Sequence, residues 1–191
     1  MQLIILIFIS REFIGEGWFK GFEGGNMQFV FEYESMLGKL LIASDGERVT
    51  GLWFVGQKYF ADNLSGEVIK QNLPVFRLTK KWLDIYFSGT APDFMPPLSM
   101  AGASPFKKRV LEIMLEIPFG QTMTYGEIAA CIECETGKKA SAQAVGGAVG
   151  HNPIGIIIPC HRVMGANKKI TGYAAGIDKK LALLKLEGII I

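Results

Sequence analysis

The segment Ile156-Ile157-Ile158-Pro159-Cys160-His161-Arg162-Val163 decides how the rest of the chain is interpreted. The apolar run is typical of a buried strand, and because Pro159 cannot donate to a strand ladder we predict that the strand ends there. Cys160 is then held at a strand end, at the rim of a sheet or a pocket. A thiol reacts as its thiolate, and the adjacent His161 and Arg162 are groups that raise the thiolate fraction.

The same residues also fit a purely structural role, with Cys160 as a small buried hydrophobe and His161 as a satisfied core histidine. The functional interpretation is favoured because His161 is one of only 2 histidines, and because its Pro and Arg neighbours suit a strand end better than a core. Adjacent side chains point to opposite faces of an extended chain, which disfavours a direct thiol–imidazole pair. A water can relay the proton instead, and a carboxylate elsewhere can orient the ring.

The composition indicates a globular protein with a modest basic bias in its C-terminal half. The chain has 191 residues, 49% hydrophobic and 20% charged, which is enough for one large or two small domains. Residues 1–100 carry 9 basic and 11 acidic side chains, whereas residues 101–191 carry 11 basic and 7 acidic ones. This asymmetry fits an anionic partner such as nucleic acid, and ordinary solvated lysines explain it at least as well.

The cysteines and the N-terminal residues indicate in which cellular compartment the protein is expected. Three cysteines do not make a disulfide framework and suit a reducing compartment, so we expect a cytoplasmic protein. Cys131 and Cys134 form a CxxC pair, but a zinc site needs two more ligands and the pair lies at helical spacing, so no metal is expected. Met1–Ser10 is too short to cross a bilayer and lacks signal-peptide features. We interpret Met1–Asn26 as an extension of unclear role and expect no membrane association.

Residues 27–95 have the pattern of a small α+β unit. Alternating and apolar runs predict three antiparallel strands, and apolar residues at helical spacing predict one helix. The predicted strands are Gln28–Glu34, Gly38–Ser44 and Val49–Val55, with a hairpin turn at Asp45-Gly46, and the helix is Val75–Phe87. A proline-containing stretch follows, and we place a linker at residues 96–104, although a long surface loop of a single domain also explains it.

From Ser104 onward the pattern becomes helical. The helix starts are Ser104-Pro105, Thr124 with Glu127 as a capping box, Ser141, and Asp178 as the cap of a last helix that reaches Glu187-Gly188. A helix, a short turn and a helix of very small residues suggest a helix-turn-helix motif. Gly146 and Gly147 each cost roughly 1 kcal/mol inside a helix. They make sense where a DNA backbone comes close, and equally where helices pack closely in the core.

Five separated blocks, in order, resemble the O6-alkylguanine-DNA alkyltransferase family. They are Val145-Gly146-Gly147-Ala148, Asn152-Pro153, Pro159-Cys160-His161-Arg162-Val163, Gly172-Tyr173 and Glu187-Gly188, and Ile117-Pro118 and Thr124-Tyr125-Gly126 also fit. The match covers roughly residues 104–188, and residues 27–95 resemble the family's N-terminal domain only in layout. The resemblance implies an α+β fold, with a ribonuclease H-like sheet-plus-helix domain at 27–95 and a mainly helical DNA-binding and catalytic domain, containing the helix-turn-helix, at 105–188.

The resemblance further implies a methylated-DNA–protein-cysteine S-methyltransferase, a monomeric repair protein that acts once. The helix-turn-helix enters the minor groove of double-stranded DNA, and the alkylated base is flipped out of the stack. The thiolate of Cys160 attacks the alkyl carbon of O6-alkylguanine, and by extension of O4-alkylthymine. The alkyl group stays on the sulfur, so transfer is irreversible and needs no cofactor.

The site residues that the resemblance implies fall into two sets. The catalytic set comprises Cys160 as nucleophile, His161 as base through a water, Glu187 holding the imidazole tautomer, Asn152 in the hydrogen-bond network, and Tyr125, which crowds the target phosphate and helps to protonate the leaving guanine. The substrate- and DNA-binding set comprises Gln143, Ala144, Gly146, Gly147, Arg162, Tyr173 and Ala174. Each of these residues taken singly also fits an ordinary structural role.

Two positions depart from the family pattern. Gln143 stands where the family usually has an arginine that fills the gap left by the flipped base, so we expect weaker DNA binding or slower repair. Ala174 and Ala175 stand where relatives often carry Ser or Gly, which preserves a backbone contact but puts the width of the pocket in doubt.

Two other functions compete with alkyl transfer. A non-catalytic, alkyltransferase-like protein that binds lesions lacks the cysteine, so the presence of Cys160 argues against it. A cysteine hydrolase predicts repeated turnover and a direct Cys–His pair, which the adjacency of the two residues disfavours.

Overall fold

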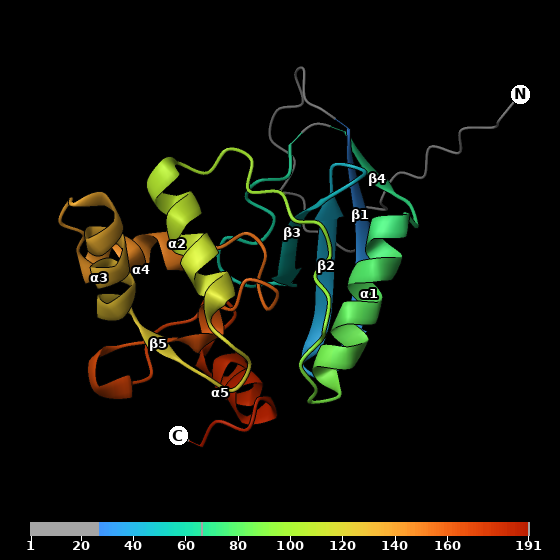
Figure 1. The fold of residues 1–191 in the computed structure, drawn as a ribbon. Coiled ribbons are helices and arrows are strands. Elements are labelled where there is room, and N and C mark those ends of the chain that lie inside the picture. Colours follow the sequence, from blue (N-terminus) through green and yellow to red (C-terminus); the bar gives the residue numbers. More distant parts are fainter. Residues whose placement is uncertain (1–26, 66, 191) are drawn as a thin grey trace, which may run out of the picture.

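The computed structural model describes residues 27–65 and 67–190, and the predicted extension at residues 1–26 lies outside them. Figure 1 shows a β-sheet with one helix on its face, beside a second group of helices built from the C-terminal half. The predicted α+β class, with a sheet-plus-helix part followed by a mainly helical part, is confirmed. Within the described ranges, none of the helices has the length and hydropathy that crossing a membrane requires.

The N-terminal sheet has four strands in the order β3-β2-β1-β4. The strands are β1 (Gln28–Ser35), β2 (Gly38–Ser44), β3 (Val49–Phe54) and β4 (Val68–Lys70), followed by α1 (Pro74–Phe87). The first three strands form the predicted antiparallel meander, and the predicted helix is present. The short strand β4, parallel to β1, was not predicted, because three residues are too few to show an alternating pattern.

Helix α1 packs on one face of this sheet through aromatic contacts. The Phe31 and Phe76 rings stack with centroids 5.8 Å apart, and the Tyr33 hydroxyl donates to Asp84 Oδ1 at 2.9 Å. The opposite face is covered by the loop after β3, whose Phe60 packs edge-on against Trp53 at 6.2 Å. Both faces of the sheet therefore bury apolar side chains, and the loop after β3 is held to the sheet.

The C-terminal half begins its helices at the predicted capping residues. The elements are α2 (Pro105–Glu116), β5 (Met123–Thr124), α3 (Tyr125–Thr136), α4 (Ala142–Gly150), the 3-10 turn η1 (Cys160–Arg162), β6 (Val163–Met164), the 3-10 turn η2 (Ala166–Lys168) and α5 (Ile177–Leu186). The side chains of Ser104, Thr124 and Ser141 each accept a backbone N–H in the first turn, as predicted. The predicted cap Asp178 is wrong, since Gly176 precedes the helix and Asp178 lies in its first turn.

The predicted strand that ends at Pro159 is also wrong. Residues 154–158 form a compact turn in which the Ile158 N–H donates to the Ile154 carbonyl at 3.0 Å, and Ile156 has a left-handed φ of 68°. All four isoleucines of this segment, Ile154, Ile156, Ile157 and Ile158, are buried. A short, continuous apolar run is compatible with any fully buried backbone conformation. Its burial was therefore predictable from the sequence, and its backbone conformation was not.

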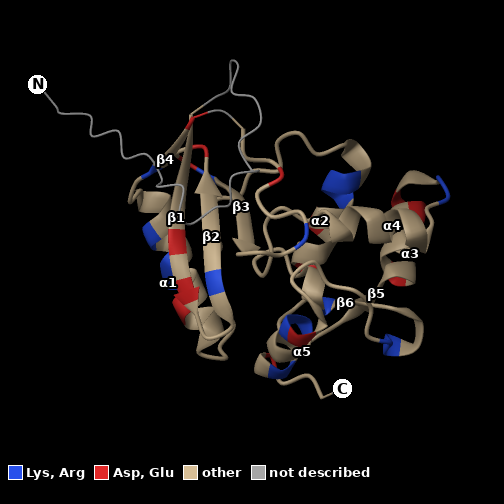
Figure 2. Ribbon diagram, turned by 180° about the vertical axis from the view of Figure 1, so that it is seen from behind, with Lys and Arg blue, Asp and Glu red and all other residues tan. Residues whose placement is uncertain are grey.

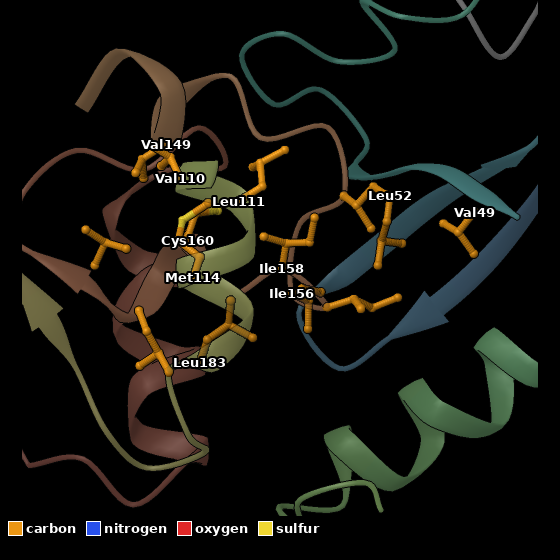
Figure 3. Packing of buried hydrophobic residues seen from close by; sticks show 14 of the residues in the cluster. Val49, Leu52, Val110, Leu111, Met114, Val149, Ile156, Ile158, Cys160 and Leu183 are labelled. Atoms are coloured by element: carbon orange, nitrogen blue, oxygen red, sulfur yellow. The ribbon is translucent and has the colours of Figure 1, made fainter. Parts of the chain in front are cut away.

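The two halves of the chain share one hydrophobic core. The Leu52 N–H donates to the Pro153 carbonyl at 2.9 Å, and the Gly155 N–H donates to the Leu52 carbonyl at 2.8 Å. Figure 3 shows Val49 and Leu52 facing Ile156 and Ile158, with Cys160 farther into the same cluster. Leu98, in the stretch predicted as a linker, pairs with Val49 at the edge of the sheet. Strand β3 therefore positions the segment that leads to Cys160.

Leu52→Ala tests this shared core. Leu52 is fully buried, so its truncation removes apolar contacts and leaves a cavity, and the free energy of unfolding should fall by about 3 kcal/mol. Urea unfolding measures the change, with Val55→Ala, which truncates a side chain that is 49% exposed directly after the same strand, as the matched control. A loss no larger for Leu52→Ala than for Val55→Ala would contradict the shared core.

Candidate active site around Cys160

Cys160 lines a cavity of about 390 Å³ between the two halves of the chain. This volume is in the range of roughly 300–1,000 Å³ that is usual for small-ligand sites. The lining residues include Tyr125, Gly146, Gly147, Asn152, Tyr173 and Ala174 from the C-terminal half, and Gln57, Lys58 and Tyr59 from the N-terminal half. Much of the predicted site therefore meets around one thiol, although its members are far apart in sequence.

Asn152 holds the Cys160 thiol and the turn that precedes it. Its Nδ2 group donates to the Ile158 carbonyl at 2.8 Å and lies 3.2 Å from Cys160 Sγ, and its Oδ1 accepts from the Ile154 N–H at 3.1 Å. Burial raises the pKa of the Cys160 thiol, and the Asn152 hydrogen bond and the charge of Lys180 oppose that rise. The resting sulfur is therefore a thiol, and its reaction as a nucleophile requires a base.

The imidazole of His161 is fully buried and faces a carboxylate. His161 Nε2 lies 2.7 Å from Glu187 Oε1, and because a carboxylate only accepts, Nε2 carries the proton. Burial lowers the pKa of the imidazole, against the opposing effect of Glu187, so the ring is neutral. Nδ1 then has a free lone pair, and it has no hydrogen-bond partner within residues 27–65 and 67–190. An unpaired buried acceptor of this kind is a candidate general base.

Glu187 lies just after α5 and is the most heavily hydrogen-bonded group described at the site. Besides His161, it accepts from Arg162 Nε at 2.8 Å, from Arg162 Nη2 at 3.0 Å and from the Gly120 N–H at 3.1 Å. Burial alone raises the pKa of this carboxyl, but His161 and Arg162 outweigh burial and hold it at about 2. A permanently ionised carboxylate keeps the proton of His161 on Nε2.

Arg162 was predicted to bind DNA, but in the structure its guanidinium is bound by other groups of the protein. Its guanidinium is buried, bound in a fork to Glu187, and donates to the Ile117 carbonyl at 2.6 Å, and it is not among the residues that line the cavity. A guanidinium is well matched to a carboxylate, and the buried Glu187 charge requires a partner. In this structure Arg162 is therefore occupied by the protein and is not presented to a ligand.

Two buried residues of the site were missed in the sequence. The hydroxyl of Tyr86, on α1, donates to Glu187 Oε1 at 2.7 Å, and its oxygen lies 3.2 Å from His161 Nε2. Lys180, on α5, is fully buried and its Nζ donates to the Val163 carbonyl at 2.6 Å. Tyr86 belongs to the apolar pattern of the helix predicted at residues 75–87, and Lys180 follows another lysine in a polar stretch, so neither carried a sequence signal of its position.

The remaining predicted residues line the cavity or lie on α4. The Tyr125 hydroxyl is 3.1 Å from Thr171 Oγ1, and the Tyr125 ring approaches Gly146. Burial raises the pKa of the Tyr173 hydroxyl well above its usual value, and the adjacent Cys160 thiol adds to the rise. Gln143 and Ala144 are exposed on the first turn of α4. No cluster of metal-ligating side chains occurs within the described part of the chain.

This arrangement defines a class of protein: a two-part α+β protein in which a cysteine lines a cavity next to a neutral histidine oriented by a carboxylate, as in enzymes that use a thiol nucleophile. Residues 105–189 match the family described as "6-O-methylguanine DNA methyltransferase, DNA binding domain", and residues 32–100 match its "ribonuclease-like domain".

Curated relatives extend over most of the chain. The chain is 43% identical over 156 residues to the methylated-DNA–protein-cysteine methyltransferase of Methanosarcina acetivorans, covering 82% of this chain and 96% of that protein. It is 40% identical over 158 residues to the Haemophilus influenzae protein of the same name, covering 82% and 84%. The crystal structure of Mycobacterium tuberculosis O6-methylguanine methyltransferase superposes with a TM-score of 0.71 at 40% identity, covering 84% and 93%.

The chain belongs to the 6-O-methylguanine DNA methyltransferase family. Its activity is that of a methylated-DNA–protein-cysteine methyltransferase, and its function is the repair of alkyl lesions in DNA. The family predicted from the separated motifs is therefore confirmed.

Lys180→Met tests the buried ammonium beside the site. Burial lowers the pKa of Lys180 from 10.5 to about 8, so between these pH values the unfolded chain binds more protons than the folded chain. Stability rises with pH wherever the unfolded state binds more protons, so wild type should gain stability relative to Lys180→Met as pH rises from about 8 to about 10.5. The gain should not exceed about 1.4 kcal/mol per pH unit.

Urea unfolding across this pH range measures the difference, and Lys179→Met, which removes the neighbouring half-buried lysine of α5, is the matched control. A difference between wild type and Lys180→Met that stays constant with pH would show that the Lys180 ammonium is not buried in solution.

Proposed function

We propose that Cys160 takes the alkyl group by in-line displacement from a base that has been flipped out of double-stranded DNA into the cavity. The sulfur–carbon bond forms as the carbon–O6 bond of O6-alkylguanine, or the carbon–O4 bond of O4-alkylthymine, breaks. The alkyl group stays on sulfur as a thioether, so each molecule acts once. The observation that carries the proposal is a thiol held by Asn152 in a cavity of about 390 Å³, one residue away from a carboxylate-oriented histidine.

His161 is the proposed base, acting through a water. Its Nε2 proton is committed to Glu187, which leaves Nδ1 as the acceptor. A bridging water then carries the thiol proton to Nδ1, and Glu187 stabilises the imidazolium that forms. The guanine leaves through its oxygen, and Tyr125, which lines the cavity, is the proposed donor of the proton that neutralises it.

The helix-turn-helix of α3 and α4 is the proposed DNA-binding element, with α4 in the minor groove. A side-chain carbon added at Gly147 meets nothing within 4 Å, so internal packing does not require a glycine there. The exposed small residues of α4 leave room for a close approach by another surface. Figure 2 shows basic residues on α2, in the loop after α3 and in the loop after β6, on the same half of the molecule. Their charge favours a phosphate backbone.

Several coarser expectations belong to the same proposal. We propose a ribonuclease H-like unit at residues 27–95, a linker at 96–104 and a DNA-binding and catalytic unit at 105–188, acting as a monomer without a cofactor. The three cysteines are free, which supports a cytoplasmic location.

Intact-protein mass measurement tests the transfer. Mixed with a duplex oligonucleotide that contains one O6-methylguanine, wild type should gain a single methyl group and then stop. Cys160→Ala should gain none, because the acceptor sulfur is absent. Cys134→Ala, which removes an exposed cysteine that does not line the cavity, should gain one methyl group and is the matched control.

Three other outcomes would contradict the proposed transfer to Cys160. Repeated demethylation of the oligonucleotide without a mass gain would indicate a hydrolase, and tight binding without a mass gain would indicate a non-catalytic lesion binder. A methyl group on Cys131 or Cys134 would contradict the assignment of Cys160 as the acceptor.

Gln143→Arg tests the effect of Gln143, which stands on α4 where the family usually has an arginine. An exposed arginine at this position adds one cation to the surface proposed to enter the groove, so DNA should bind more tightly or be repaired faster. The slope of log affinity against log salt should steepen by about 1. Fluorescence anisotropy and single-turnover repair measure both effects. Gln71→Arg, which adds the same charge at an exposed position of the N-terminal half, is the control. An equal gain in affinity or repair rate in both variants, or a gain in neither, would contradict a position of residue 143 at the DNA-binding surface.

A further inference from the structure

One wall of the cavity around Cys160 comes from the N-terminal half of the chain. The segment Gln57–Tyr59 begins three residues after the end of β3 and lines the cavity together with the end of α4 and the loop at residues 172–174. These three residues belong neither to the motifs of the C-terminal half nor to the group that surrounds Glu187. Because they line the same cavity as Cys160, they are positioned to contact a ligand bound there.

The segment is joined to two separate parts of the cavity wall. The Lys58 N–H donates to the Ala174 carbonyl at 3.0 Å. The Tyr59 ring lies against the ring of His151, with centroids 4.1 Å apart. His151 ends α4 and directly precedes Asn152, which holds the Cys160 sulfur. The segment therefore connects the loop beside Tyr173 with the end of α4.

The backbone of this segment is held in an unusual conformation. Tyr59 and Ala61 have φ values of 59° and 58°, in the left-handed region that side chains other than glycine rarely adopt. Phe60 between them is buried against Trp53. Asn63 Nδ2 donates to the Thr50 carbonyl at 2.8 Å. Such a conformation costs free energy and persists where the surroundings determine it, often at ligand sites.

The Tyr59 ring is accordingly a fixed wall and not a mobile flap. Its backbone is anchored on both sides by Phe60 and by the Lys58–Ala174 hydrogen bond, and its ring is held by His151. The Lys58 ammonium lies over the same ring at 4.7 Å from its centroid. Moving the ring aside to admit a larger ligand would break its contacts with His151 and with the Lys58 ammonium.

We propose that Tyr59 limits the size of the alkyl group that Cys160 accepts, so that small groups such as methyl transfer readily and ring-sized groups such as benzyl are disfavoured. The inference rests on the proposed transfer to Cys160 and assigns a specificity-determining residue to the N-terminal half. The physical basis is exclusion, because a rigid aromatic wall excludes volume without forming any bond to the substrate.

The test compares two duplex oligonucleotides that differ only in the alkyl group, one with O6-methylguanine and one with O6-benzylguanine. Single-turnover rates are measured by the mass gained on Cys160. In Tyr59→Ala the benzyl-to-methyl rate ratio should rise about tenfold, the size of effect that a change of shape in an apolar pocket produces. Tyr59→Phe keeps the ring on His151 and should retain the wild-type ratio, and Asp62→Ala, an exposed change in the same loop, controls for general loop effects.

His151→Ala is the second variant, because it removes the ring that supports Tyr59 without altering the strained backbone. The ratio should again rise, by less than in Tyr59→Ala. A ratio that stays within about twofold of wild type, or falls, in whichever of Tyr59→Ala and His151→Ala is folded by circular dichroism overturns the inference. Absence of any methyl gain in wild type would instead overturn the proposed function, so the two failures are distinguishable.

Discussion

A single buried carboxylate organises the reactive part of this protein. Glu187 receives hydrogen bonds from His161, Arg162, Tyr86 and the Gly120 backbone, which come from three separate parts of the chain. A buried negative charge is tolerated only when its oxygens are fully satisfied, and removal of one partner leaves the others uncompensated. The folding of α1, of the turn after α2, of η1 and of α5 is therefore coupled to the ionisation of one side chain.

This coupling has a chemical consequence for the sulfur. Since Glu187 takes the Nε2 proton of His161, the other ring nitrogen becomes the acceptor. Burial at the same time keeps Cys160 as a thiol until a proton acceptor is available. The site thus combines a buried thiol with a neutral histidine whose tautomer is fixed by Glu187, and these two groups are the nucleophile and the base of the proposed transfer.

Parts of this architecture were predictable because they depend on local interactions. The caps at Ser104, Thr124 and Ser141 depend on a side chain and a backbone N–H three residues away, and the meander on alternation within each strand. The strand expected before Pro159 failed for the opposite reason, because a buried apolar run is compatible with a turn as well as with a strand. Arg162 was misplaced because a guanidinium serves a phosphate and a buried carboxylate equally well, and its sequence neighbours do not distinguish the two.

The amino-acid sequence by itself determined the family, the α+β class, the helix starts at Ser104, Thr124 and Ser141, and the cysteine around which the site is built, since all of these depend on residue types at short or ordered spacings. The tertiary structure alone decided which groups surround that cysteine. Tyr86 and Glu187 are 101 residues apart in sequence and 2.7 Å apart in space, and Lys58 meets Ala174 at 3.0 Å. Such contacts arise when the two halves bury their common core, and no local pattern in either half encodes them.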